Sequence, residues 1–166
     1  SIGGGGGYTT LNEDLPTSDA SNIVILGDKN SLRSRSGSIV VDNSGNLFST
    51  GMASSALVVQ SIGGGGGNIR QLDSDSLGSS VHLGSTNNSF GAGGDITVNN
   101  SSQFITTTGD FARAVLIQSI GGGGGWLAGS TQQDTNATIG SVLSSGTVNS
   151  GNIIFTNSAD INTSGL

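Results

Sequence analysis

The stretch Ser61-Ile62-Gly63-Gly64-Gly65-Gly66-Gly67 occurs three times in this chain, at residues 1–7, 61–67 and 119–125. Each glycine in an ordered element costs roughly 0.5–1 kcal/mol of chain entropy relative to alanine, so five cost about 2.5–5 kcal/mol per repeat. Ordered packing has to offset that cost. The repeated runs therefore predict that backbone approaches backbone here too closely for any Cβ atom. Recent duplication, with glycines that have not yet diverged, is the alternative explanation.

The glycine runs belong to a longer unit, which recurs every ~57–60 residues. Two sets of residues recur at intervals of 57, namely Ile39, Ile96 and Ile153, and Asn43, Asn100 and Asn157. A further strip aligns Val24-Ile25-Leu26-Gly27, Val81-His82-Leu83-Gly84 and Ala137-Thr138-Ile139-Gly140. We therefore expect one continuous array of three repeats, at 1–60, 61–118 and 119–166, the last one incomplete. Because the chain starts and stops inside repeats, we also expect it to be a window of a longer protein.

Apolar residues within each unit are spaced by two. Ile96 and Val98 alternate with Thr97 and Asn99, and the same spacing recurs in the other copies. This alternation is typical of strands with one buried face. Turn residues such as Asn43-Ser44-Gly45 separate these stretches. Residues 51–60 are interpreted as a turn followed by a strand, and no helical stripe persists beyond about one turn.

Short strands with a fixed long period favour an all-β solenoid over a sandwich. We expect a right-handed β-helix built from these long repeats. With roughly 18–25 residues per coil, one repeat would make about three coils and rise about 14 Å at the ~4.8 Å spacing of stacked strands. The whole chain would then form a rod about 40 Å long. Intervening coils would separate equivalent residues, although Asn43, Asn100 and Asn157 should share one face.

The glycine runs have two possible structures in such a stack. Each is either an extended strip packed against a neighbouring strip or a flexible loop. The apolar lead-in Leu57-Val58-Val59-Gln60-Ser61-Ile62 continues directly into the glycines and favours the ordered strip. Aromatic residues follow two of the runs, Tyr8 and Trp126, and either close the strip or lie at an interface.

Composition limits the function more than it defines it. The formal charge is −6, and only five Lys and Arg residues are scattered along the 166 positions, so no basic stripe exists to bind nucleic acid. Hydrophobic residues make up 33%, which predicts a thin core rather than a thick globular one. No stretch approaches 18 apolar residues, and no signal peptide is recognisable. The absence of cysteine assigns no compartment.

The strings Gln60-Ser61-Ile62-Gly5 and Gln118-Ser119-Ile120-Gly5, with the preceding Gly-x-Ile-x-Val-x-Asn-Ser-Gly tract, resemble the repeats of very large bacterial surface and autotransporter-type proteins. The resemblance covers nearly the whole chain. It implies an extracellular β-helical region, often described as adhesin-like, without a catalytic motif in the repeats. In many such proteins the run continues as Asn-Gly-Gly, whereas here Asn68 is followed by Ile69, so the backbone after the run is expected to differ.

Candidates for catalysis are few. His82 is the only histidine, and it lies between Val81 and Leu83, so it should face outward if they face inward. It has no partner for metal binding, and no Ser-His-acid arrangement can be assembled. The carboxylates at Glu13-Asp14, Asp73 with Asp75, and Asp110 suggest a β-helix polysaccharide lyase or hydrolase, but they do not follow the repeat period, so solvated loops are favoured.

Three binding motifs are also incomplete. Gly91-Ala92-Gly93-Gly94-Asp95-Ile96 only partly matches the calcium-binding β-roll signature. The glycine runs lack the Gly-Lys-Ser/Thr ending of a phosphate-binding loop. Thr106-Thr107-Thr108 and Thr9-Thr10 suggest an ice-binding face, but no regular Thr-x-Thr pattern supports it.

Taken together, these patterns predict a structural repeat of an extracellular bacterial surface fibre or adhesin stalk. It would support adhesion or biofilm and filament formation, without catalysis and without cofactor or metal. Its expected partners are further copies along the fibre, and surface glycans or neighbouring cells. A glycan- or ice-binding module and a carbohydrate-active β-helix enzyme remain the alternatives.

Overall fold

The computed structural model describes residues 1–2, 6–11, 23–26, 35–71, 80–84, 91–128, 136–140 and 148–165. Within these residues every secondary-structure element is a β-strand, and every pair of neighbouring strands is parallel. The described part contains neither a helix nor a closed barrel. The prediction of an all-β chain is therefore confirmed.

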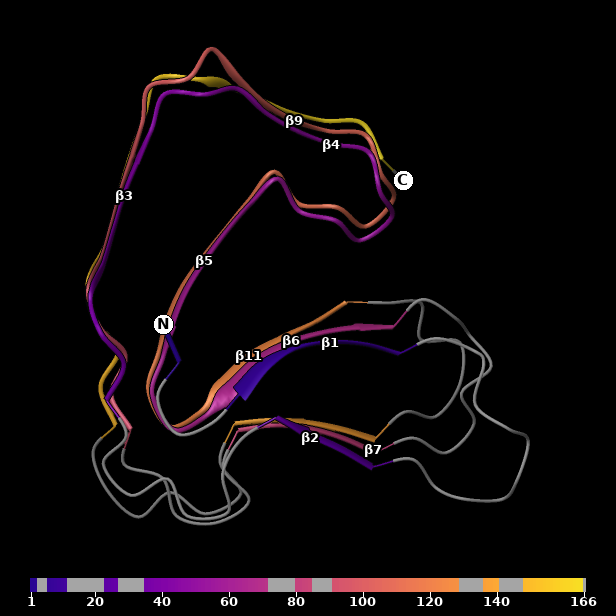
Figure 1. Ribbon diagram of the computed structural model, residues 1–166, viewed down its shortest axis with the longest axis vertical. Coiled ribbons are helices and arrows are strands. Elements are labelled where there is room, and N and C mark those ends of the chain that lie inside the picture. Colours follow the sequence, from indigo (N-terminus) through magenta and orange to yellow (C-terminus); the bar gives the residue numbers. More distant parts are fainter. Residues whose placement is uncertain are drawn as a thin grey trace.

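The strands form five columns, each joined across successive passes of the chain. The columns are β1 (Gly6–Leu11), β6 (Gly66–Gln71) and β11 (Gly124–Ala128); β2 (Ile23–Leu26), β7 (Ser80–Leu83) and β12 (Asn136–Ile139); β3 (Ile39–Asn43), β8 (Ile96–Asn100) and β13 (Ile153–Asn157); β4 (Leu47–Ser49), β9 (Phe104–Thr107) and β14 (Asp160–Thr163); and β5 (Leu57–Ile62) with β10 (Val115–Ile120). Ile2 extends the last column through a parallel bridge to Ile62. Figure 1 looks along the stacking direction, so the three passes overlie one another as three layers.

Equivalent residues of consecutive repeats are direct neighbours. Ile96 of β8 pairs with Ile39 of β3 and with Ile153 of β13, its equivalents in the repeats before and after it. The aligned strip of β2, β7 and β12 pairs in the register expected from the sequence, with Val24 and Ala137 both opposite Val81. The expectation that further coils separate equivalent residues is therefore wrong.

The size of each layer explains the error. Figure 1 shows that one pass follows a long, indented path with two lobes, one formed by β3, β4 and β5 and the other by β1 and β2 with their partners. Such a path uses far more residues than a simple coil. Three layers at about 4.8 Å each separate the first from the third by only about 10 Å. The expectation of a long rod is wrong as well, because the stacking direction is the short dimension in Figure 1.

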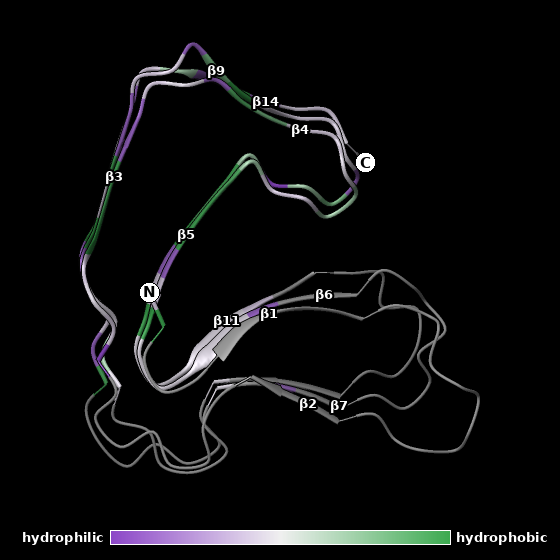
Figure 2. Ribbon diagram, in the orientation of Figure 1, coloured by the Kyte–Doolittle hydropathy of each residue, from purple (hydrophilic) through white to green (hydrophobic). Residues whose placement is uncertain are grey.

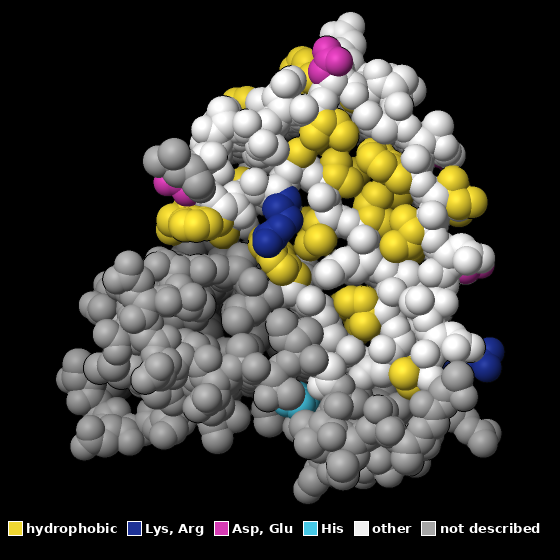
Figure 3. Space-filling model, turned by 180° about the vertical axis from the view of Figure 1, so that it is seen from behind, with side chains coloured by type: hydrophobic (Ala, Val, Ile, Leu, Met, Phe, Trp, Pro, Cys, Tyr) yellow, Lys and Arg dark blue, Asp and Glu magenta, His cyan; other side chains and the backbone are white. Residues whose placement is uncertain are grey.

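The described core lies inside the β3–β5 lobe, between the strands that face each other across it. Val59 of β5 packs with Ile96 and Val98 of β8, and both residues of β8 are fully buried. A second cluster beneath β9 contains Ile105 and Ala114. Figure 2 shows the hydrophobic strip along β5, and Figure 3 shows hydrophobic side chains gathered inside this lobe.

The alternation in β8 follows the predicted spacing of two. Ile96, Val98 and Asn100 are buried, whereas Asn99 is exposed and Thr97 is partly exposed. The segment from Gly51 forms a turn that leads into β5, as expected. Local apolar spacing therefore identified the buried face of this strand correctly.

Candidate functional site: the seam between layers

The serines of the repeated Gln-Ser-Ile stretch join two columns and two layers at once. The Ser61 hydroxyl donates a hydrogen bond to the Gly37 carbonyl (2.9 Å) and accepts one from the Gly94 amide (2.8 Å). One layer further, the Ser119 hydroxyl donates to the Gly94 carbonyl (2.8 Å) and accepts from the Gly151 amide (2.7 Å). A hydroxyl serves both roles because it carries one donor and two acceptor lone pairs.

The same contact begins in the first layer, where the Ser1 hydroxyl accepts a hydrogen bond from the Gly37 amide (2.9 Å). Each of the three equivalent serines thus accepts a hydrogen bond from a glycine amide, and Ser61 and Ser119 also donate one to a glycine carbonyl. We call the region formed by residues 60–67, 118–125 and the facing strip 91–94 the interlayer seam. Ser61 is completely buried within it.

Glycine is required where the serines draw the two columns together. A Cβ atom on Gly94 would lie 2.5 Å from the carbonyl oxygen of Gly37 in the layer below. A Cβ atom on Gly93 would lie 2.5 Å from the Ser119 hydroxyl and 2.8 Å from the Ile120 amide. Any side chain at these positions would push the two columns apart and lengthen the serine hydrogen bonds.

The glycine run itself reverses the chain between β5 and β6. Gly64 and Gly65 have φ values of 90° and 83°, and Gly66 and Gly67 follow with 137° and 145°. Residues 122–125 repeat this series with 80°, 85°, 146° and 149°. Residues that carry a side chain rarely adopt these backbone conformations. The described runs therefore combine a reversal of the chain with a short extended strip.

Close packing on several sides adds a second requirement for glycine. A Cβ atom on Gly66 would fall on the carbonyl oxygen of Gly124 in the next layer, and one on Gly63 would overlap the backbone of Ala92. A Cβ atom on Gly123 would lie 2.9 Å from Cα of Gly84, at the end of β7. The prediction that backbone meets backbone at the runs is confirmed, because the run passes between two other segments of the chain.

Side-chain amides form ladders along the stack, one within the seam and one in the β3 column. The Gln60 amide nitrogen donates to the Gln118 side-chain oxygen at 2.6 Å. In the β3 column, Asn43 donates to Asn100 at 2.6 Å, and Asn100 donates to Asn157 at 2.7 Å. The asparagines share one face as expected, and they also form direct hydrogen bonds because no further coil separates them.

Trp126, the residue after the third run, packs against a charged side chain. The Arg113 guanidinium lies 4.5 Å from the centre of the Trp126 ring, a distance at which a cation is attracted to the ring face. This contact joins the end of the run to the segment before β10. The equivalent Tyr8 has a side chain outside the described part of the chain.

No protein-family model, curated protein or solved structure matches this chain. Its function is therefore inferred from the geometry of its own residues.

The candidates for catalysis are not brought together in the described part of the chain. His82 is half-buried on β7, and the residues opposite it are Ile25 and Thr138, neither of which titrates. Asp110 is exposed in the turn after β9. Among the described residues no three His, Cys, Asp or Glu side chains are grouped as a metal site would need. Glu13, Asp14, Asp73 and Asp75 lie outside the described residues.

The partial calcium signature is engaged in contacts within the chain. An Asp95 carboxylate oxygen accepts a hydrogen bond from the Asn152 amide of the next layer at 2.8 Å. The glycines before it form part of the seam. At the suggested ice-binding face, the position of Thr106 is occupied in the neighbouring layers by Phe48 and Asn162, so no threonine ladder runs through it. No helix in the described ranges is long and apolar enough to cross a membrane.

Neither the contacts of the seam serines and glutamines nor an exposed groove on the β9 column is predicted from the sequence. Gln-Ser-Ile stands unchanged before the second and third runs, at 60–62 and 118–120, and this repetition was the available signal. From its sequence alone this stretch is predicted to be an apolar lead-in to the glycines. The groove had no such signal, because its residues differ from layer to layer.

Proposed function

We propose that this chain is a β-solenoid segment of an extracellular bacterial surface fibre, with one coil for each repeat. Its task is structural: it extends and stiffens a stalk that supports adhesion or biofilm formation, and it performs no catalysis. The observation that carries the proposal is the direct, in-register pairing of equivalent residues in three layers. A right-handed sense follows the strong general preference of parallel crossover connections.

The mechanism is mechanical. Backbone hydrogen bonds join the layers along the stacking direction, as between the Ile39 amide and the Asp95 carbonyl (2.8 Å) and between the Ile96 amide and the Asn152 carbonyl (2.8 Å). Force along that direction loads many such bonds in parallel. The asparagine and glutamine ladders hold the register, because a slip by one residue would break them and expose the apolar face.

Self-association supports the same function. Ile153, Ile154 and Phe155 of β13 are exposed, at 46%, 57% and 37% of their surface. Within the described residues β13 pairs on one side only, with β8, and an unpaired strand edge with apolar side chains is a template for a further strand. A repeat of the same kind, from the same chain or another copy, would pair there and continue the stack. The surface location rests on the resemblance of the Gln-Ser-Ile-Gly5 repeats to those of bacterial surface proteins.

Immunogold electron microscopy of the producing cells tests this function. Antibodies against this chain should label thin fibres that project from the cell surface. Their monovalent fragments should reduce attachment of the cells to a substratum, because they cover the stalk, whereas non-immune fragments should leave attachment unchanged.

Two outcomes would contradict the proposal. One is label confined to the cell interior or to compact secreted particles. The other is depolymerisation of polygalacturonate by the purified chain that is lost in Asp73→Asn or Asp75→Asn, since this would favour the enzyme alternative.

A further inference from the structure

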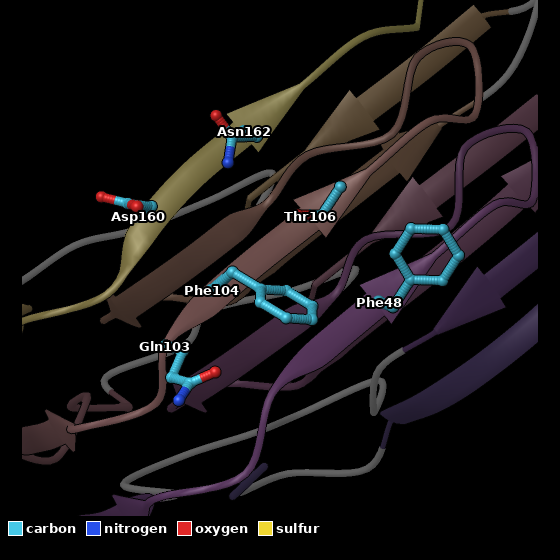
Figure 4. A pocket seen from close by; sticks show the side chains of 6 residues that line it. All are labelled: Phe48, Gln103, Phe104, Thr106, Asp160 and Asn162. Atoms are coloured by element: carbon cyan, nitrogen blue, oxygen red, sulfur yellow. The ribbon is translucent and has the colours of Figure 1, made fainter.

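A groove crosses the outer face of the column formed by β4, β9 and β14, away from the seam. The inward residues of these strands anchor it, since Ile105 is fully buried between Leu47 and Ile161 in register. The outward side chains come from all three layers. Figure 4 shows the six that line the groove: Phe48, Gln103, Phe104, Thr106, Asp160 and Asn162.

The backbone that carries the groove is held in place by a side chain of the first layer. The Asn46 side-chain oxygen accepts hydrogen bonds from the amides of Gln103 (2.9 Å) and Phe104 (3.2 Å). The Asp160 amide in turn donates to the Gln103 carbonyl at 3.0 Å. The start of β9 is thus held by hydrogen bonds to both neighbouring layers. The Gln103 and Phe104 side chains project from this backbone.

The lining of the groove combines two exposed aromatic rings with four polar side chains. Phe48 exposes 63% of its surface and Phe104 exposes 37%. Four polar side chains stand around the two rings, and within the described residues none of them forms a hydrogen bond to the rest of the chain: Gln103, Thr106, Asp160 and Asn162. Together they offer amide and hydroxyl donors and amide, hydroxyl and carboxylate acceptors.

We propose that this groove binds a neutral oligosaccharide. A pyranose ring has an apolar C–H face that packs on the electron-rich face of a phenyl ring. Its hydroxyl groups both donate and accept hydrogen bonds, as do the free amide and hydroxyl groups beside the rings. This ligand-binding role goes beyond the structural function proposed above and does not depend on it.

Other occupants fit the groove less well. A wholly apolar partner would bury four polar groups without hydrogen bonds, at a cost of about 1–3 kcal/mol for each unsatisfied group. Nucleic acids and acidic polysaccharides carry negative charge, which the Asp160 carboxylate and the net charge of −6 repel. A neutral sugar meets neither penalty.

A glycan-binding assay on the purified chain tests the site. The probes are immobilised neutral tetrasaccharides, namely chitotetraose, cellotetraose, mannotetraose and maltotetraose, with polygalacturonate as the acidic probe. We expect at least one neutral probe to bind. Phe48→Ala and Phe104→Ala should each weaken that binding about tenfold, because each removes one stacking surface. Asn162→Ala should weaken it as well, by the loss of hydrogen bonds.

Phe111→Ala is the matched control, because Phe111 is 58% exposed and lies outside the groove. It should leave binding unchanged. Circular dichroism of each variant should match the parent, since the altered side chains are exposed.

Four outcomes would overturn the proposal. In the binding assay these are that no neutral probe binds at millimolar concentration, that only polygalacturonate binds, or that the three groove variants bind like the parent. The fourth is self-association in sedimentation that Phe48→Ala abolishes, because the groove would then be a contact between copies.

Discussion

Replacing Gly66 with alanine is expected to destabilise the folded chain severely or to prevent folding. The new Cβ atom would overlap the Gly124 carbonyl oxygen, and Gly66 has a φ of 137° that alanine rarely adopts. An unfavourable backbone conformation costs about 1–3 kcal/mol, and overpacking costs about 1–3 kcal/mol more. Their sum is a large part of the roughly 5–15 kcal/mol typical of a folded domain. Urea unfolding followed by circular dichroism measures the change.

A second glycine provides the control for this substitution. Gly45 lies in an exposed turn, and the nearest atom to a new Cβ there is 3.8 Å away. Gly45→Ala should therefore change the free energy of unfolding by no more than about 0.5 kcal/mol. Equal effects of the two substitutions would show that the seam is not closely packed.

Loss of the central asparagine in the amide ladder should also have a large effect. Asn100 is 3% exposed and connects Asn43 to Asn157 through hydrogen bonds of 2.6 and 2.7 Å. Asn100→Ala removes both bonds and also a third, which the Asn100 side-chain oxygen accepts from the Ser102 hydroxyl at 3.1 Å, and it leaves a small cavity. At about 0.5–1.5 kcal/mol for each hydrogen bond, plus a desolvation penalty for partners left incompletely bonded, the expected loss is about 2–4 kcal/mol. Thermal and urea unfolding measure it.

The neighbouring asparagine is the matched control for Asn100. Asn99 is exposed, and it donates a single hydrogen bond to Asp42 on the outer face at 2.8 Å. Asn99→Ala should cost less than about 1 kcal/mol, because water replaces the lost partner. A loss as large as that of Asn100→Ala would mean that the ladder contributes no more than a surface contact.

The sequence predicted the strands and their buried faces because both depend on local spacing. Ile96 and Val98 are apolar at alternate positions. Alternation with a period of two indicates a β-strand with one buried face, and not a helix. The regular interval between Asn43 and Asn100 likewise predicted that they share a face. These inferences needed no knowledge of how the chain closes each layer.

The number of layers per repeat could not be obtained in this way. A repeat of this length is compatible with three small coils or with one large indented one, and the same apolar alternation occurs in both. The glycine run decides between them, because its positive φ values at Gly64 and Gly65 reverse the chain and create the second lobe. Glycine in a sequence permits such angles without requiring them.

The roles of Ser61 and Ser119 were hidden for a different reason. Serine is abundant in the chain, and the carbonyl and amide that each one contacts are distant from it in the sequence. Only the packing of the β5 column against the strip 91–94 brings them together. The groove beside Phe104 depends on the stacking of three different layers, so no single repeat contains it.

The distance between equivalent positions in the first and third repeats tests the one-layer-per-repeat structure most directly. Val40 and Ile154 both lie opposite Thr97 and are 70% and 57% exposed, and the chain has no cysteine of its own. Spin labels on Val40→Cys and Ile154→Cys should therefore show strong dipolar broadening, as expected for backbones about 10 Å apart. Singly labelled chains and dilution with unlabelled protein exclude coupling between molecules. A separation of about 29 Å, as three coils per repeat would give at the same strand spacing, would contradict the structure.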